Sequence, residues 1–321
     1  MEEGLDREGE RRRDRINALV CIASSFFLMM LEFTLPIFTL PLMAYSAVSG
    51  KKESRKVFIP VFLIVLLRTL YYTWGNEDIL AWALVELYVP LSLSAAGYIW
   101  INGRNRRVET RLLESMVPAL LMTAGISIVF YLDRALFESF YSTLKDAFAL
   151  AMGGAFSSLG IEADIDFLFY VATIAVGIFA LPVVFGAVCV SVFFYENKRH
   201  SKETGWEEIV CGIEFSQNMV WLLILFLFLF LLGRFVSMPL VLSMAFMSLT
   251  ITMPMVYAIQ GFSVVSAWIR NAGIAIRSSQ LFITLLLLSM ILPGLNIIVL
   301  FGLPVLGVLE NFFNLKTRRK K

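Results

Sequence analysis

This chain of 321 residues is poor in the side chains that most enzyme sites use. Its one histidine, His200, stands in a charged segment, and a histidine-based metal site cannot be built from a single histidine. The three cysteines, Cys21, Cys189 and Cys211, are widely separated, which argues against a disulfide framework or a zinc site and predicts buried thiols. The chain also lacks a Walker-type loop, a G-x-S-x-G elbow and an H-E-x-x-H motif. We therefore expect no enzyme activity, no cofactor and no nucleotide-hydrolysing site.

Charge is scarce as well, because charged residues are 16% of the chain and hydrophobic residues are 59%. A soluble domain is usually about half apolar and a quarter charged. This chain could not cover its core with polar surface, so lipid must be the solvent for much of it. No linker or internal repeat interrupts the apolar runs. We expect a charged cytoplasmic N-terminus over residues 1–15, a single transmembrane bundle over 16–315 and a basic cytoplasmic tail over 316–321.

Long apolar runs predict the transmembrane helices, since a helix needs about 20 apolar residues to cross a bilayer. The runs Ile16–Val48 and Leu281–Leu315 are too long for one crossing, so each predicts two helices, with turns near Thr34–Pro36 and Pro293–Gly294. The other predicted spans are Val57–Tyr72, Ile79–Ile101, Leu112–Leu132, Ile165–Tyr195, Met219–Leu232 and Val236–Trp268. The predicted fold class is an all-α membrane bundle of about ten helices, and at least eight.

Basic residues collect on alternate segments of this arrangement. Of the 27 lysines and arginines, 23 lie in the two termini and in every second loop, and only Arg134, Lys145 and Arg234 lie in the other loops. This asymmetry follows the positive-inside rule, so it predicts a bacterial inner-membrane protein with both termini in the cytoplasm. The basic clusters are short and stand where this topology requires them, so we expect no nucleic-acid binding. The remaining basic residue, Arg68, falls inside a span.

One exterior segment, residues 133–164, is longer than the other loops. Phe137, Phe140, Leu144 and Phe148 recur at intervals of three and four, which predicts an amphipathic helix ended by Gly153-Gly154. This helix either lies in the outer membrane interface or packs on top of the bundle.

Ionisable residues inside spans are costly and usually face a cavity or a partner. Glu32, Arg68 and Glu86 are of this kind. A short loop joins the spans that hold Arg68 and Glu86, so these spans are antiparallel neighbours and the two residues differ in depth by about 6 Å. We therefore expect Arg68 to pair with Glu86 or with Glu32. Such a pair either belongs to a substrate site or fixes the register of the helices.

Gln260 is the fourth candidate substrate-binding residue. It follows Pro254, which frees a backbone carbonyl, and precedes Gly261, which lets another helix approach closely. Gln260 therefore either lines a cavity or hydrogen-bonds a neighbouring helix.

The C-terminal third contains Tyr257–Val265 with its Gln260-Gly261 step, a basic loop with Arg270 and Arg277, and the closing segment Leu306–Lys316. In these features it resembles the YybS-like family of uncharacterised bacterial multi-pass membrane proteins. That family looks remotely like the substrate-binding membrane component of energy-coupling-factor vitamin transporters. In those transporters an Ala-x-x-x-Ala step often docks the coupling subunit, and the corresponding Ala18–Ala23 stretch here lacks that spacing.

These features together favour small-molecule binding or transport, with lipid around the protein and a partner protein supplying energy. Transport predicts a polar cavity lined by Arg68, Glu86 or Gln260. The alternative function is a membrane scaffold or assembly factor that recruits other proteins. It predicts that those groups are paired within a tight bundle and that the exterior helix offers an exposed surface.

Overall fold

The computed structural model describes residues 2–75, 78–103, 106–159, 164–199, 207, 210–236, 238–274, 276–291 and 296–316. All secondary-structure elements in these ranges are helical, which confirms the all-α class. Five helical stretches of the described chain are long and apolar enough to cross a membrane: Glu53–Thr73, Ile79–Asn102, Val108–Leu132, Ile165–Arg199 and Leu240–Asn271. Shorter apolar helical stretches cover Asn218–Gly233 and Val299–Phe313. The predicted count of ten spans is not confirmed.

In chain order the elements are α1 (Glu2–Met30), η1 (Glu32–Ile37), α2 (Leu40–Thr73), α3 (Ile79–Asn102), α4 (Val108–Leu132), α5 (Arg134–Leu159), α6 (Ile165–Arg199), α8 (Asn218–Phe235), α9 (Leu240–Asn271), α10 (Ser278–Ile291), η2 (Ile298–Gly302) and α12 (Leu303–Phe313). Local sequence signals explain where two of these helices, α5 and α6, begin. Asp133 and Asp164 each accept a hydrogen bond of 3.0 Å from a backbone N–H in the first turn of the helix that follows, as N-cap residues do.

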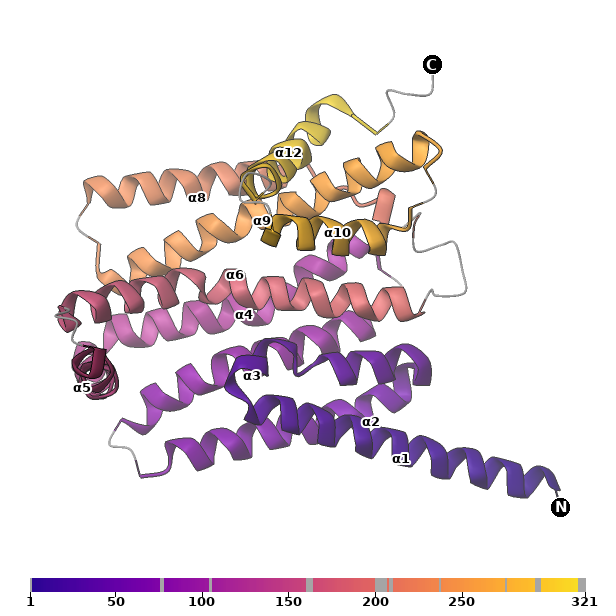
Figure 1. Cartoon of the computed structure of the whole chain (residues 1–321), viewed down its shortest axis with the longest axis horizontal. Helices are drawn as coiled ribbons and strands as arrows, with labels where there is room; N and C mark the ends of the chain where they lie inside the picture. Colours follow the sequence, from indigo (N-terminus) through magenta and orange to yellow (C-terminus); the bar gives the residue numbers. More distant parts are fainter. Residues whose placement is uncertain are drawn as a thin grey trace.

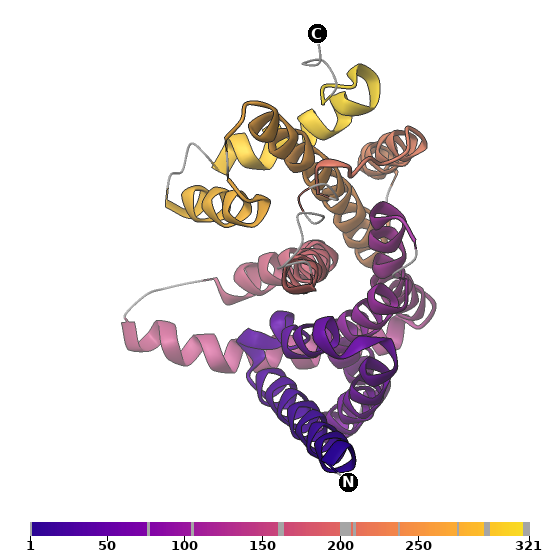
Figure 2. The same cartoon turned by 90° about the vertical axis from the view of Figure 1, so that its right-hand side faces the viewer.

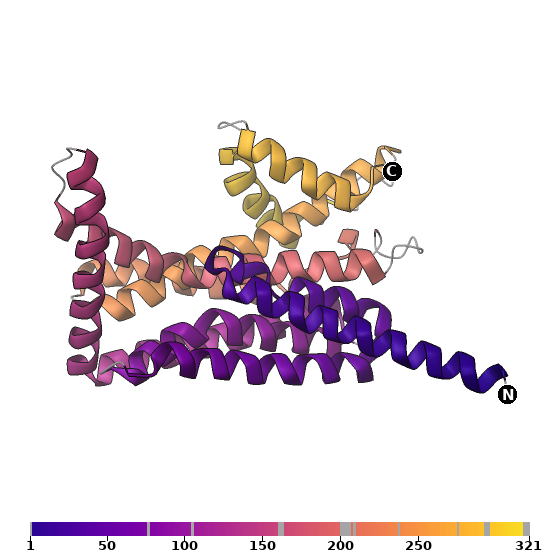
Figure 3. The same cartoon turned by 60° about the horizontal axis from the view of Figure 1, so that its bottom comes forward.

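Most helices lie side by side, with α6 in the middle (Figure 1). α6 contacts α2 and α3 on one side and α9 on the other, and it also contacts α4, so it joins the N-terminal helices to the C-terminal ones. α5 lies across one end of the bundle (Figure 3). In Figure 2, which looks along the length of the bundle, most other helices are seen end-on and α5 is seen lengthwise. We call this end the α5 end, and the opposite end, from which α1 projects, the α1 end.

The first predicted hairpin forms, but it stops partway along the bundle. η1 covers the turn predicted at Thr34–Pro36. Directly after η1, the Thr39 and Ser191 hydroxyl oxygens lie 3.2 Å apart. Ser191 stands eight residues, or about 12 Å, before the end of α6 at Arg199. Figures 1 and 3 show the tip of this hairpin well short of the α5 end. Residues 16–48 therefore form a hairpin that enters the bundle from the α1 end and turns back inside it, and they do not form two full crossings.

Residues 51–56, predicted as a basic loop, lie inside α2, and α2 bends there. A Cβ atom on Gly97 would lie 3.3 Å from Met43 Sδ and 3.2 Å from a ring carbon of Phe58. Met43 and Phe58 are fifteen residues apart, which is about 22 Å in a straight helix. Both side chains reach Gly97 because α2 turns back between them, as Figure 1 shows. The chain therefore reverses its direction at residues 51–56, as the predicted loop requires, although these residues are helical.

α5 packs on the end of the bundle through its aromatic face. The Phe140 and Trp82 ring centroids lie 5.0 Å apart, and those of Phe148 and Phe169 lie 5.5 Å apart. The predicted amphipathic helix is thus confirmed, and it packs on the end of the bundle, as one of its two predicted placements requires. The predicted end at Gly153-Gly154 is wrong, because α5 continues to Leu159.

The last predicted pair of spans, Leu281–Leu315, is made of short helices. α10 has 14 residues and α12 has 11, and η2 directly precedes α12. At about 1.5 Å per residue, the described part of α10 is about 21 Å long. The turn predicted at Pro293–Gly294 lies outside the described residues.

Candidate functional site

Arg68 of α2 binds Glu86 of α3, as predicted. Its Nη1 atom donates a hydrogen bond of 2.8 Å to Glu86 Oε2. The Arg68 side chain is 4% exposed, whereas the Glu86 side chain is 30% exposed. The guanidinium carbon also lies 4.8 Å from the centroid of the Tyr72 ring. The pair therefore joins two adjacent antiparallel helices in the half of the bundle nearer the α5 end.

Glu32, the other predicted partner of Arg68, does not reach it. Glu32 is the first residue of η1 at the tip of the first hairpin, and it is exposed. Within the described chain its carboxylate makes no hydrogen bond or ion pair. The structure thus separates Glu32 from the Arg68–Glu86 pair.

One face of α3 carries polar contacts along most of its length. Glu86, Leu93, Gly97 and Trp100 follow one another at intervals of seven, four and three residues, so they lie on the same side of the helix. From Glu86 to Trp100 this side is about 21 Å long. We call these four residues the α3 face.

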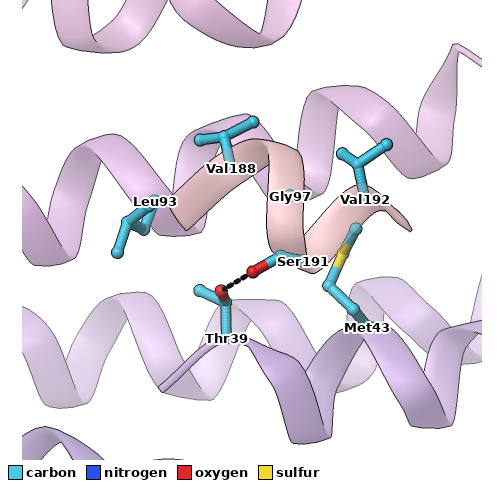
Figure 4. Close-up of a pocket in the computed structure, with 7 residues that line it drawn as sticks. All are labelled: Thr39, Met43, Leu93, Gly97, Val188, Ser191 and Val192. Atoms are coloured by element: carbon cyan, nitrogen blue, oxygen red, sulfur yellow. Dashed lines mark hydrogen bonds between the residues drawn. The ribbon is translucent and has the colours of Figure 1, made fainter. Parts of the chain in front are cut away.

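A small void lies against the α3 face between Leu93 and Gly97, as Figure 4 shows. It has a volume of about 10 Å³, close to the least that holds one water molecule. The Thr39 and Ser191 hydroxyls meet at this void, and the rest of its lining is apolar. The tip of the first hairpin, α3 and α6 therefore converge on one hydroxyl pair.

A second ion pair lies beyond the void, at the Trp100 end of the α3 face. Arg111 Nη2 of α4 donates a hydrogen bond of 2.8 Å to Glu196 Oε1 of α6, and the two side chains are 4% and 2% exposed. Trp100 Nε1 donates to the same carboxylate oxygen at 2.9 Å. Arg199 Nη1 lies 3.5 Å from Glu196 Oε2. This cluster ties α3, α4 and α6 together near the α1 end.

Sequence reasoning missed this second pair because both residues were assigned to charged loops. Arg111 follows three other arginines, and Glu196 begins a run that continues with Asn197 and Lys198. The structure extends α4 and α6 into these segments and buries both charges. The available signal was Trp100, an indole donor that needs an acceptor at the end of an apolar span.

Gln260 belongs to a separate network on α9, away from the α3 face. It is fully buried, its Nε2 atom donates to Asn311 Oδ1 at 2.8 Å, and its Oε1 atom accepts from the Phe215 N–H at 3.3 Å. Gln260 thus joins α9 to α12 and to the segment before α8. Of its two predicted roles, the structure shows the hydrogen bond to a neighbouring helix.

α9 and α12 cross at two glycines beside Gln260. A Cβ atom on Gly261 would lie 1.9 Å from the carbonyl oxygen of Leu303, and one on Gly307 would lie 2.0 Å from that of Tyr257. Both distances are far below van der Waals contact, so no larger residue fits either position without moving a helix. The close approach predicted at Gly261 is confirmed.

Lys316, the first residue of the predicted basic tail, is held in the same region. Its Nζ atom donates to the carbonyl oxygen of Ile213 at 2.7 Å, and its side chain is 8% exposed. Burial lowers the pKa of Lys316, and the nearby carboxylates of Glu214 and Glu310 act in the opposite direction. The residues after Lys316 lie outside the described ranges.

No cluster of three metal-binding side chains occurs among the residues that the structure describes, and His200 is not among them. The three cysteines are free thiols, and burial raises the pKa of Cys211, which keeps its thiol protonated. The polar chemistry of the α3 face is therefore limited to ion pairs, hydroxyls and an indole donor.

Comparisons of this chain with protein-family models, with curated proteins and with solved structures find no match. The class of the protein follows from its own architecture. Five long apolar helices and a surface rich in exposed Leu, Ile and Phe are typical of a helical membrane protein.

Proposed function

We propose that this protein binds and transports a small polar solute along the α3 face, and that its described form is closed. The observation that carries the proposal is the hairpin tip at Thr39, where helical structure breaks inside the bundle. Irregular backbone at membrane depth is tolerated where it is buried in protein or lines a cavity, and broken helices of this kind mark binding sites in transporters. The break lies between Arg68–Glu86 and Arg111–Glu196, two ion pairs that could each open and close one end of a path.

The proposal includes a topology with six crossings in the bacterial inner membrane. α8 is the sixth, because it is apolar, packs beside α9 and has 18 residues, which is about 27 Å of helix. The first hairpin and the α10–α12 region each return to the side from which they start. Both termini and the 23 basic residues therefore stay on the cytoplasmic side, as the positive-inside rule requires. Tyr71, Tyr72 and Trp74 are exposed at the α5 end of α2, where an aromatic belt would mark the outer interface.

Cysteine labelling tests whether the closed path opens. In a full-length variant without native cysteines, Thr39→Cys is placed in sealed vesicles and treated with a membrane-impermeant thiol reagent. A transporter must expose Thr39 to water in part of its cycle, so we expect slow labelling. Val256→Cys, fully buried on α9 away from the α3 face, is the matched control and should stay unlabelled. Complete protection of Thr39→Cys from both sides would contradict transport.

Ligand-dependent stability tests binding. The unfolding midpoint of the full-length protein is measured with separate classes of water-soluble metabolites. A solute that binds the native form raises the midpoint. We expect that Thr39→Val abolishes this rise, and that Thr143→Val, on the exposed side of α5, preserves it.

The alternative function, a membrane scaffold or assembly factor, is favoured by one observation. Arg68 and Gln260 are bonded within the protein, and the void at Thr39 has room for about one water molecule at most. If Thr39→Cys is protected and no solute class stabilises the protein, the scaffold becomes the better proposal.

Membership of the YybS-like family is also part of the proposal. Two of the segments that carry the resemblance are the Gln260-Gly261 step and the closing run from Leu306. These segments meet at the crossing of α9 and α12, where Gly261 and Gly307 pack and Gln260 bonds Asn311. Two motifs that pack on each other are expected to occur together, which supports treating them as one family signature.

A further inference from the structure

Glu32 is an exposed carboxylate at the tip of a hairpin that ends inside the length of the bundle. The hairpin reaches at least to the level of Thr39, where it contacts Ser191, and η1 itself contacts both α3 and α6. Thr39 shares its void with Leu93, which stands nine residues, or about 13 Å, before the end of α3 at Asn102. If the bundle spans a bilayer about 30 Å thick, Glu32 lies within the hydrocarbon layer.

The surface around Glu32 is apolar. Phe33 is 81% exposed, Phe27 is 63% exposed and Met30 is 36% exposed. These side chains suit contact with lipid or with another membrane helix. An ionised carboxylate among them is costly unless a cation pairs with it.

This chain supplies no such cation from the groups buried between its described spans. Arg68 is bound to Glu86, and Arg111 is bound to Glu196. A second copy of the chain would present the same occupied arginines, so self-association does not satisfy Glu32. A cation that pairs with an ionised Glu32 would therefore come from a different molecule within the membrane.

We infer that the α1–η1 surface around Glu32 is a docking site for a transmembrane helix of a partner protein that carries a lysine or arginine at the depth of Glu32. The apolar side chains would pack against the partner helix, and the ion pair would set its depth and orientation. This inference does not rest on transport along the α3 face, because a scaffold needs such a surface equally.

The test uses the full-length protein in phosphatidylcholine vesicles with a synthetic probe. The probe is a Leu/Ala transmembrane peptide with one lysine, placed in separate peptides at the centre or one turn toward either end, and association is measured by energy transfer. We expect the peptide with lysine at one of these three depths to associate with the wild-type protein about tenfold more tightly than with Glu32→Gln. A peptide with glutamine at the same depth should not distinguish the two proteins.

Two controls make the outcome decisive. Glu138→Gln removes an exposed carboxylate from α5 and should leave peptide association unchanged. Equal association of the lysine peptide with wild type and Glu32→Gln, at every depth, overturns the inference. The inference is also overturned if the unfolding midpoint of the wild-type protein is higher in phosphatidylethanolamine vesicles than in phosphatidylcholine vesicles, Glu32→Gln abolishes this difference, and the lysine peptides do not distinguish the two proteins. The cation would then be a lipid headgroup amine.

Discussion

The two ion pairs of the α3 face differ in burial and in the number of helices they join. Arg68–Glu86 joins α2 to α3, and its carboxylate is 30% exposed. Arg111–Glu196 lies where α3, α4 and α6 meet, both side chains are less than 5% exposed, and Trp100 donates a further hydrogen bond. Removing one partner of a buried pair leaves an uncompensated charge, and the cost is larger the more completely that charge is enclosed by protein. The buried pair should therefore contribute more to stability, and the exposed pair should open more easily.

The largest expected effect comes from breaking the buried pair. Glu196→Ala leaves the Arg111 guanidinium unpaired, and we expect the free energy of unfolding to fall by about 3–5 kcal/mol. Denaturant unfolding in detergent measures this loss. The double variant Arg111→Met with Glu196→Leu should recover most of it, because an apolar pair of similar volume replaces both charges. A loss below about 1 kcal/mol for Glu196→Ala would show that the cluster is hydrated.

Breaking the exposed pair should cost less. Arg68→Met keeps most of the apolar contact of the side chain and leaves unpaired only Glu86, which is not enclosed by protein, so we expect a loss of about 1–2 kcal/mol under the same conditions. The comparison between the two pairs fails if Arg68→Met destabilises the protein as much as Glu196→Ala does.

The hydroxyl pair between the two ion pairs should have a smaller effect. Ser191→Ala leaves the buried Thr39 hydroxyl without its partner, at an expected cost of about 1 kcal/mol. Adding Thr39→Val should restore stability nearly to the wild-type value, because both polar partners are then replaced by apolar groups. The unfolding midpoints of the single and double variants check this prediction, and additive losses would contradict it.

Lys316, a buried charge outside the spans, should give the smallest effect, seen as a dependence on pH. Its pKa is lower in the folded chain than its ordinary value of 10.5, so the unfolded chain binds more protons between these two values. The free energy of unfolding should therefore rise as pH increases toward 10.5. Lys316→Met should lack this rise, and parallel pH profiles of the two proteins would show that Lys316 is solvated.

The predictability of the two pairs differs for a physical reason. Arg68 and Glu86 are 18 residues apart across a short connection, so loop length and helix rise were enough to bring them together. Arg111 and Glu196 are 85 residues apart, and each stands among other charges at the end of a span. Nothing local distinguishes them from solvated loop residues. Their contact depends on how three helices pack.

The first hairpin shows the same limit for the fold. Its apolar length and its turn near Pro36 could be predicted, because both are local properties of the chain. Its depth could not, since an apolar run of this length fits two crossings or one re-entrant hairpin equally well. The contact between Thr39 and Ser191, partway along α6, decided between them.

By itself, the sequence determined that the chain is helical and membrane-compatible, that charge is divided between alternate segments, and that Arg68 lies within a span with Glu86 or Glu32 as its expected partner. These properties depend on composition, periodicity and short connections. Only the tertiary structure decided that α5 packs on the bundle, that Gln260 closes a helix crossing, that Glu196 is buried beside Arg111 and that Glu32 is left exposed. Each of these depends on contacts between helices far apart in the chain, because in a membrane apolar surface alone does not specify which helix packs against which.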